Sequence, residues 1–407
     1  AGTHNFFSEG VLVSNCYKNL YFHTKMTRIA GLPNTDSQRA FDMFVKVRNL
    51  LQNNKRFIGL TGTPLTNTMA EIFTMQRYFQ YETLVDLGLS HFDSWAQMFA
   101  DAVMIPEMTP DGGGFRVNTR LARFTNIPEL ASMLSQFMIM RRWEQVSSEV
   151  ERPMLYNGKP TPVRMPGSRP LKEFVKELAE RAEEVRGGKV DPKDDNMLKI
   201  IGEGRKAALD MRMVWPGLPD LKSSKINTAA WVIAEIYLVT EEHKAAQLVF
   251  CDLGTPKPQK EKIVTAAEEE NEEESRYEED EPVFQNVYAD LKAKLVHNGV
   301  RPDEIAFIHD ARNPSARAQL FESVRLGRIR VLIGSTEKMG TGMNVQTRAI
   351  AMHHLDAPWR PADLEQRDGR LLRQGNLYRE VFSFVYITES SFDAYVWVRH
   401  EVVSLIV

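Results

Sequence analysis

Residues 330–344 have the sequence RVLIGSTEKMGTGMN, and this stretch gives the strongest indication of the fold. The run 330–334 is typical of a buried strand, and a turn that contains two glycines follows it. Gly340 and Gly342 allow backbone N–H groups to approach a ligand closely. Open α/β sheets bind ligands at turns that follow parallel strands. The segment is therefore a candidate binding loop, although an ordinary turn explains it equally well.

Strand-like and helix-like segments alternate on both sides of this stretch. Strands are expected at 247–251, 305–308, 330–334, 349–352 and 381–386, and helices at 226–240, 284–297, 314–326 and 361–373. This alternation predicts a parallel sheet covered by helices, in a domain of about 180 residues. No internal repeat is evident.

The beginning of the chain predicts a second α/β layer. Strands are expected at Val11–Val13 and Arg56–Leu60, and helices at 36–52 and 67–80. Residues 85–221 lose the alternation, carry apolar residues at helical spacing and contain a clear helix at 170–186, so we interpret them as a helical insertion and connector. The expected domains are 1–84, 85–221 and 222–397, with an acidic loop at 259–281 and a divergent tail at 398–407.

Composition excludes several classes of protein. The chain has 407 residues, a net charge of −3 and two cysteines, Cys16 and Cys251, which cannot form a disulfide framework or a closed metal site by themselves. No apolar run is long enough to span a membrane. Ten acidic residues lie between 268 and 281, so the rest of the chain is mildly basic and suited to an anionic partner. We expect a reduced, cytoplasmic setting.

Candidate chemistry is concentrated in Asp363–Gly375, which contains Arg367, Arg370 and Arg373 at intervals of three residues. On a helix these arginines would form one cationic edge, and phosphate matches the guanidinium fork. The alternative is a solvated helix face whose arginines pair with acidic neighbours on the same helix. Those neighbours are Asp363, Glu365 and Asp368.

Taken together, four segments resemble the superfamily two helicases, particularly the Swi/Snf-type ATPases. Residues Leu60–Asn67 resemble motif III, Met140–Arg142 the connector between lobes, Ser335–Asn344 motif V, and Asp356–Pro361 with 366–373 motif VI. The sequence of residues 17–80 further resembles that of the phage- and plasmid-borne methylase–helicase fusion proteins. The resemblance covers residues 17–395.

The resemblance implies an α/β fold of two RecA-like lobes, a partial first lobe and a complete second lobe, with ATP between them and DNA across their tops. Arg373 would be the arginine finger, with Arg370 beside it, and Gln366 would help to position the nucleotide. Further residues implied for nucleotide binding are Gly340 and Gly342, and those implied for sequence-independent contacts to the DNA backbone are Thr61, Gly62, Thr63, Thr341 and Asn344.

The sequence departs from the family where ATP and Mg²⁺ should bind. It contains no P-loop of the form Gly-x-x-x-x-Gly-Lys-Ser/Thr; the nearest string, Gly187–Lys189, continues with Val190. The place of motif II, Val11–Cys16, lacks an Asp-Glu pair, so Mg²⁺ ligands are not found. We therefore expect a fragment of a longer protein whose missing part completes the first lobe, with a fused methyltransferase as a candidate partner domain.

Two other functional interpretations remain open. The chain could be a non-enzymatic nucleic-acid-binding module that keeps the RecA-like shape, or a subunit of a restriction system. No metal site is expected, because His353 and His354 are adjacent on a strand and face opposite ways. One of these histidines is expected in the core and the other at the surface.

Overall fold

The structure, a computed structural model, divides into two compact units, residues 1–149 and 150–407. It describes residues 5–8, 11–15, 24–26, 29, 32, 38–61, 68–108, 115–141, 145, 149–187, 190–191, 193–256, 284, 286–339, 343–358, 361–393 and 396–397. Several predictions fall outside these residues: those on Gly62, Thr63, Gly340, Thr341, Gly342 and Arg142, on the acidic loop 259–281 and on the tail 398–407.

The first unit contains a small sheet of three strands, in the order β1-β2-β3. The strand β2 (Val11–Asn15) pairs parallel with β3 (Phe57–Leu60), and the helix α1 (Gln38–Gln52) lies between them in the chain. This arrangement confirms the expected strand, helix, strand order. β1 (Asn5–Ser8) is antiparallel to β2, so the layer is not purely parallel.

Helices that follow β3 form the core of the first unit. They are α2 (Ala70–Phe79), α3 (Tyr81–Asp86), α4 (Phe92–Phe99) and α5 (Ile127–Ser135). Trp95 is buried among Phe73, Phe92 and Phe99, and its indole N–H donates to Gln76 Oε1 at 2.7 Å. The buried indole is therefore satisfied, as the cost of an unpaired donor requires.

A long hairpin lies within the range interpreted as a helical insertion. β4 (Ala100–Met108) pairs antiparallel with β5 (Phe115–Phe124). The sequence between these strands contains Asp111 followed by three glycines, Gly112–Gly114, a pattern that favours a turn. These two strands were not predicted, because an antiparallel pair is stabilised by contacts with the partner strand rather than by the pattern of either strand alone.

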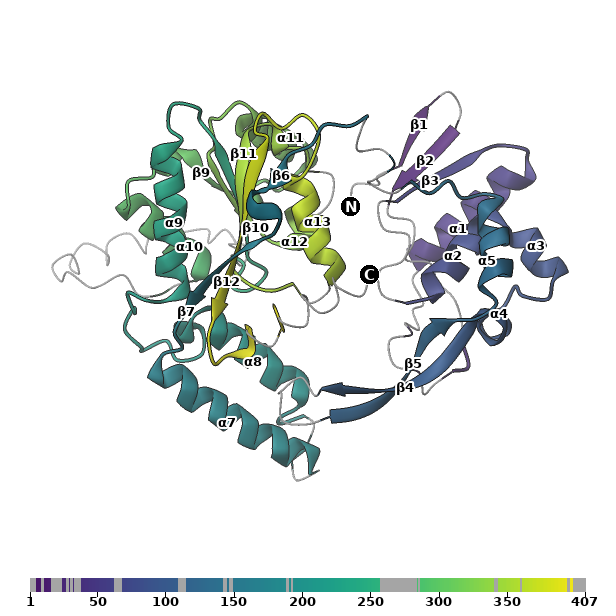
Figure 1. Cartoon of the computed structure of the whole chain (residues 1–407), viewed down its shortest axis with the longest axis horizontal. Coiled ribbons are helices and arrows are strands. Elements are labelled where there is room, and N and C mark those ends of the chain that lie inside the picture. Colours follow the sequence, from purple (N-terminus) through teal and green to yellow (C-terminus); the bar gives the residue numbers. More distant parts are fainter. Residues whose placement is uncertain are drawn as a thin grey trace, which may run out of the picture. The chain divides into compact units, whose positions relative to one another are not determined.

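The second unit is built on seven strands (Figure 1). The order is β9 (Ile305–Phe307), β10 (Val331–Gly334), β8 (Ala246–Phe250), β11 (Ala349–His354) and β12 (Glu380–Thr388). Both β6 (Met154–Leu155) and β7 (Thr161–Met165) pair with β12, and every pairing in this sheet is parallel. The predicted α/β fold class with a parallel sheet is thus confirmed for the second unit.

Helices cover both faces of this sheet (Figure 1). α9 (Lys225–Val239) and α10 (Val287–His297) pack on one face, and α11 (Pro314–Arg325) and α13 (Pro361–Leu371) on the other. α12 (Thr336–Met339) follows β10. Ser224, Asn286 and Asn313 cap three of these helices with side-chain oxygens, which satisfies N–H groups that no helical carbonyl can reach.

Two further helices, α7 (Arg169–Arg186) and α8 (Met197–Leu209), belong to the second unit and share an apolar core with Phe392. Among the described residues, no helix has the length and apolar character that a membrane crossing requires.

One expectation is wrong for the histidine pair. His353 and His354 do face opposite sides of β11, but both are fully buried. The reason is that a parallel sheet with helices on both faces has no solvent-exposed side. His353 contacts Tyr386 and Gln247 at 3.0 Å each, and burial lowers its pKa to about 3.

Candidate functional site

The carboxyl edge of the second sheet holds an ion-pair cluster around Arg367, a fully buried residue of α13. Its Nη2 donates to Asp252 at 2.8 Å and to Asp356 at 3.3 Å, and its Nε donates to the Thr336 hydroxyl at 2.8 Å. The three partners lie just past the ends of β8, β11 and β10, respectively. One guanidinium therefore links a helix to three neighbouring strand ends.

Asp356 is held in this cluster by backbone donors as well. Its Oδ2 accepts from the N–H groups of Asp252 at 2.7 Å and Leu253 at 2.8 Å. Burial raises the pKa of Asp356, and the adjacent Arg367 guanidinium opposes that rise by stabilising the charged carboxylate. The cluster is a structural feature of the sheet edge, and its carboxylates were not among the predicted site residues.

A signal for these carboxylates exists in the sequence. Asp252 directly follows the apolar run 247–251, and Asp356 follows the run 349–354 after one intervening residue. Acidic residues at the carboxyl ends of neighbouring parallel strands meet at one edge of the sheet. That reasoning would have identified both residues before the structure.

His354 contacts the same cluster through Arg367. Its Nδ1 faces Arg367 Nη1 at 3.4 Å, and its Nε2 faces Asp368 and Ser383 at 3.2 Å each. Burial lowers the pKa of His354, so the ring is neutral at pH 7. A ring that accepts at Nδ1 carries its hydrogen on Nε2, and this tautomer matches the acceptors Asp368 and Ser383.

The expected cationic edge contains Arg370 and Arg373 but not Arg367. Arg370 is half-buried and Arg373 is exposed, and their Nη1 atoms donate to the same carbonyl oxygen, that of Met343, at 3.2 and 3.3 Å. Three residues turn a helix by about 300°, so each successive arginine points about 60° away from the one before. α13 also ends at Leu371, before Arg373. The prediction of a three-arginine edge was therefore wrong for Arg367.

The remaining predicted residues occupy several places. Gln366 is half-buried on α13. Asn344 is exposed and directly follows Met343, and its carbonyl accepts from Arg325 at 2.8 Å. Thr61 is exposed and follows β3 in the first unit. The structure thus brings Arg370, Arg373 and the Met343–Asn344 backbone together.

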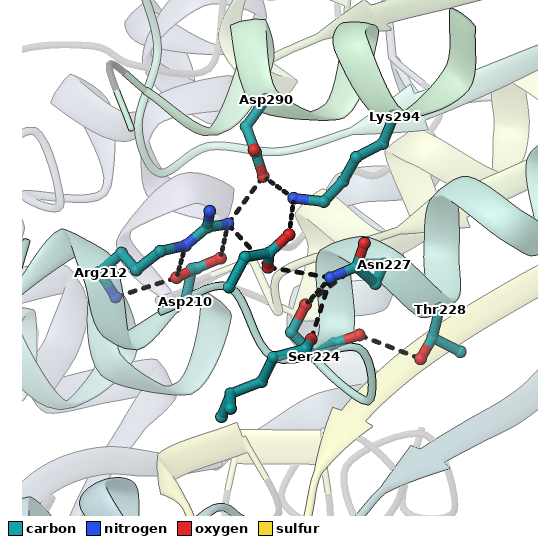
Figure 2. Close-up of polar contacts among 9 residues, drawn as sticks. Asp210, Arg212, Ser224, Asn227, Thr228, Asp290 and Lys294 are labelled. Carbon is teal, nitrogen blue, oxygen red and sulfur yellow. Dashed lines mark hydrogen bonds and ion pairs between the residues drawn. The ribbon is translucent and has the colours of Figure 1, made fainter. Parts of the chain in front are cut away.

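A second cluster of charges lies beside α8 in the same unit (Figure 2). Arg212 donates to Asp210 at 2.7 Å and to Asp290 at 2.8 Å, and Lys294 donates to Asp290 at 2.5 Å. Asp220 completes the cluster, at 2.7 Å from Lys294. The paired charges join the end of α8 to α10, so we interpret the cluster as structural.

The hydrogen-bond donors of Arg370 and Arg373 indicate the kind of ligand that these side chains suit. Arg370 and Arg373 converge on one carbonyl oxygen, and two guanidinium forks that meet at a point suit a phosphate group. Across the described part of the chain, no group of three or more His, Cys, Asp or Glu side chains is arranged to hold a metal ion.

Comparison with known families finds helicase similarity in both units. Residues 4–141 match the family described as "Probable helicase domain", and residues 279–375 match the "Helicase conserved C-terminal domain". The second match includes the segment with Arg370 and Arg373. No curated protein matches the chain.

Two solved structures show similarity to this chain. One is the C-terminal part of the Fun30 ATPase domain, at 16% identity and a TM-score of 0.30, with 50% of this chain and 57% of that chain covered. Another is a variant of S. cerevisiae Dbp5 bound to RNA and ADP BeF3, at 15% identity and a TM-score of 0.28, with 47% of this chain and 44% of that chain covered. The chain thus spans about half the length of each structure. By its two family matches, the chain contains a helicase-like segment in the first unit and a helicase C-terminal segment in the second.

Proposed function

We propose that this chain is part of an ATP-dependent DNA helicase or translocase and that it supplies the arginine residues that act on ATP. The observation that carries the proposal is the convergence of Arg370 and Arg373 on the carbonyl oxygen of Met343, within the segment similar to helicase C-terminal domains.

The two arginines would act on the charge that develops during phosphoryl transfer. ATP supplies the phosphoryl group, and Arg373, with Arg370 beside it, would donate N–H groups to its oxygens. Met343 O now accepts from both side chains, so it keeps the two guanidiniums close to each other. Gln366 lies on the same helix and would help to position the nucleotide.

The other half of the catalytic site is proposed to lie elsewhere. Since the sequence contains no P-loop and no acidic pair at the place of motif II, we infer that another segment or chain supplies the phosphate-binding loop and the Mg²⁺ ligands. The resemblance to methylase–helicase fusions of phages and plasmids suggests a longer protein with a methyltransferase as its source. DNA would be bound through its backbone, with Thr61 and Asn344 among the contacts.

The decisive test compares ATP hydrolysis by this chain with that of the protein from the complete open reading frame, each with and without DNA. We expect background activity from this chain and DNA-stimulated hydrolysis from the longer protein. In the longer protein, Arg373→Ala should lower kcat by about 10³- to 10⁵-fold, because the developing charge loses its donor. Arg301→Ala, which removes an exposed arginine of the same unit, is the matched control.

Two results would contradict the proposal. A clear Mg²⁺-dependent ATPase in this chain alone, lost in Arg373→Ala, would show that the site is complete here. An unchanged kcat for Arg373→Ala in the longer protein would remove the arginine-finger role.

The second candidate is a nucleic-acid-binding module without enzyme activity. The absence of a P-loop and of the acidic pair favours it. It predicts salt-sensitive DNA binding, because phosphate contacts release counterions, but no ATP hydrolysis even in the longer protein. DNA binding that is indifferent to salt would contradict both candidates.

A further inference from the structure

We propose that Arg367 is a positioning residue: it fixes the rotation and location of α13 and thereby places Arg370 and Arg373. This inference deepens the proposed function and depends on it for what the two arginines do. The claim about the orientation of α13 depends only on the contacts of Arg367.

Arg367 is not itself a phosphate ligand, because its hydrogen-bonding capacity is already used. A guanidinium has five N–H donors in one plane. Nε donates to Thr336, Nη2 donates to Asp252 and Asp356, and Nη1 donates to the Asp356 carbonyl at 3.0 Å and faces His354 at 3.4 Å. All five donors have a partner within the protein, and the side chain is fully buried.

The inner face of α13 explains why a buried charge is useful there. Arg367 and Leu371 are its two fully buried positions among the described side chains, and Leu364 is half-buried on the same face. Apolar contacts are not directional, so leucines alone would tolerate a small rotation of the helix. The five directional hydrogen bonds of Arg367 fix the rotation, a role in conformational specificity that buried ionic groups serve in some proteins.

Asp252 also contacts Thr336, which precedes Met343 in the chain. Its Oδ1 accepts from the Thr336 N–H at 2.6 Å, and its Oδ2 accepts from the Thr336 hydroxyl at 2.9 Å. Thr336 begins α12, and the chain from α12 leads to Met343, whose carbonyl accepts from Arg370 and Arg373. One carboxylate therefore fixes the start of α12 and, through Arg367, the orientation of α13.

Arg370 follows Arg367 by three residues, a rise of about 4.5 Å along the helix. A change in the rotation of α13 would move the Arg370 guanidinium further than it moves the backbone, since the side chain extends away from the helix axis. A displacement of about 1 Å at a catalytic group can lower kcat by about 10²-fold. The buried cluster is thus placed where a small shift would have a large effect.

The test measures hydrogen exchange across residues 363–378 of the 407-residue chain, for wild type, Arg367→Met and Arg330→Met. Arg330 is a matched control: it is also buried and donates to Ala245 O and Tyr237 O, but at the amino edge of the sheet. We expect exchange in this segment to be about tenfold faster in Arg367→Met and nearly unchanged in Arg330→Met. Arg367→Lys, which keeps the charge without the fork, should restore protection only in part.

Asp252→Asn serves as a second variant if Arg367→Met does not fold, because the amide keeps the size of the side chain and loses only its charge. It should also accelerate exchange in 363–378. In the longer protein, Arg367→Met should lower kcat by about 10²-fold with little change in KM for ATP.

The proposal is overturned if exchange in 363–378 is unchanged in Arg367→Met, or if Arg330→Met accelerates it equally. An unchanged kcat in the presence of faster exchange would also overturn it, because the arginines would then not depend on α13. If the wild-type longer protein hydrolyses no ATP, the proposed function fails, and the exchange measurement still decides whether Arg367 fixes the helix.

Discussion

Replacing Arg212 with methionine tests the physical interpretation of the charge cluster in Figure 2. The exposed fractions of the side chains of Arg212, Asp210 and Asp290 are 8%, 4% and 17%. Methionine keeps much of the aliphatic length but removes the cation that faces both carboxylates. Lys294 would remain as the cation of the cluster for Asp290 and Asp220.

The expected decrease in the free energy of unfolding of Arg212→Met follows from the burial of the cluster. Breaking a buried ion pair from one side costs about 3–5 kcal/mol, because it leaves an uncompensated charge. Lys294 still pairs with Asp290 in the variant, so we expect the lower end, about 3 kcal/mol. Arg212 also lies 4.4 Å from the centre of the Phe284 ring, and losing that contact removes about 0.5–1 kcal/mol more.

The measurement is equilibrium unfolding in urea at pH 7, followed by circular dichroism. Arg181→Met is the control, because Arg181 on α7 pairs with Asp195, which precedes α8, and with Glu203 on α8. The exposed fractions of these three side chains are 23%, 14% and 25%. Because this cluster is more solvated, Arg181→Met should lower the free energy of unfolding by only about 1 kcal/mol. Equal losses for Arg212→Met and Arg181→Met would refute the argument that burial sets the magnitude.

Two further predictions concern the same unit. The pKa of His353 is about 3 in the folded state and about 6.5 when unfolded, so its contribution to stability is complete above pH 6.5 and is lost as pH falls toward 3. His353→Leu should therefore flatten the decline of the unfolding free energy between pH 7 and 5, and an unchanged slope in urea titrations would contradict this. In α8, a Cβ on Gly204 would lie 2.5 Å from the Phe392 ring, whereas one on Gly202 meets nothing within 4 Å. Thermal unfolding should show Gly204→Ala destabilised by about 1–3 kcal/mol and Gly202→Ala stabilised by up to about 1 kcal/mol; similar values for both would contradict the packing argument.

Local sequence patterns predicted most of the elements of the second unit. The expected strand 330–334 corresponds to β10, 349–352 to β11 and 381–386 to β12, and the expected helix 361–373 corresponds to α13. These predictions succeeded because strands buried on both faces are continuous apolar runs, which need no knowledge of partners. The hairpin β4-β5 was missed because an antiparallel pair is stabilised by its partner strand rather than by its own pattern.

The sequence by itself determined the order of the strands and helices from β8 to β12, the α/β class and the position of the arginines in the chain, because these depend on neighbours a few residues away. Only the tertiary structure decided that Arg367 is internal while Arg370 and Arg373 share the Met343 carbonyl. Arg367 meets Asp252 across 115 residues of chain, and spacing within a helix cannot reveal a partner on another strand. The physical reason is that a parallel sheet gathers the ends of distant strands at one edge, where burial and pairing of charges are set by which side chains meet there.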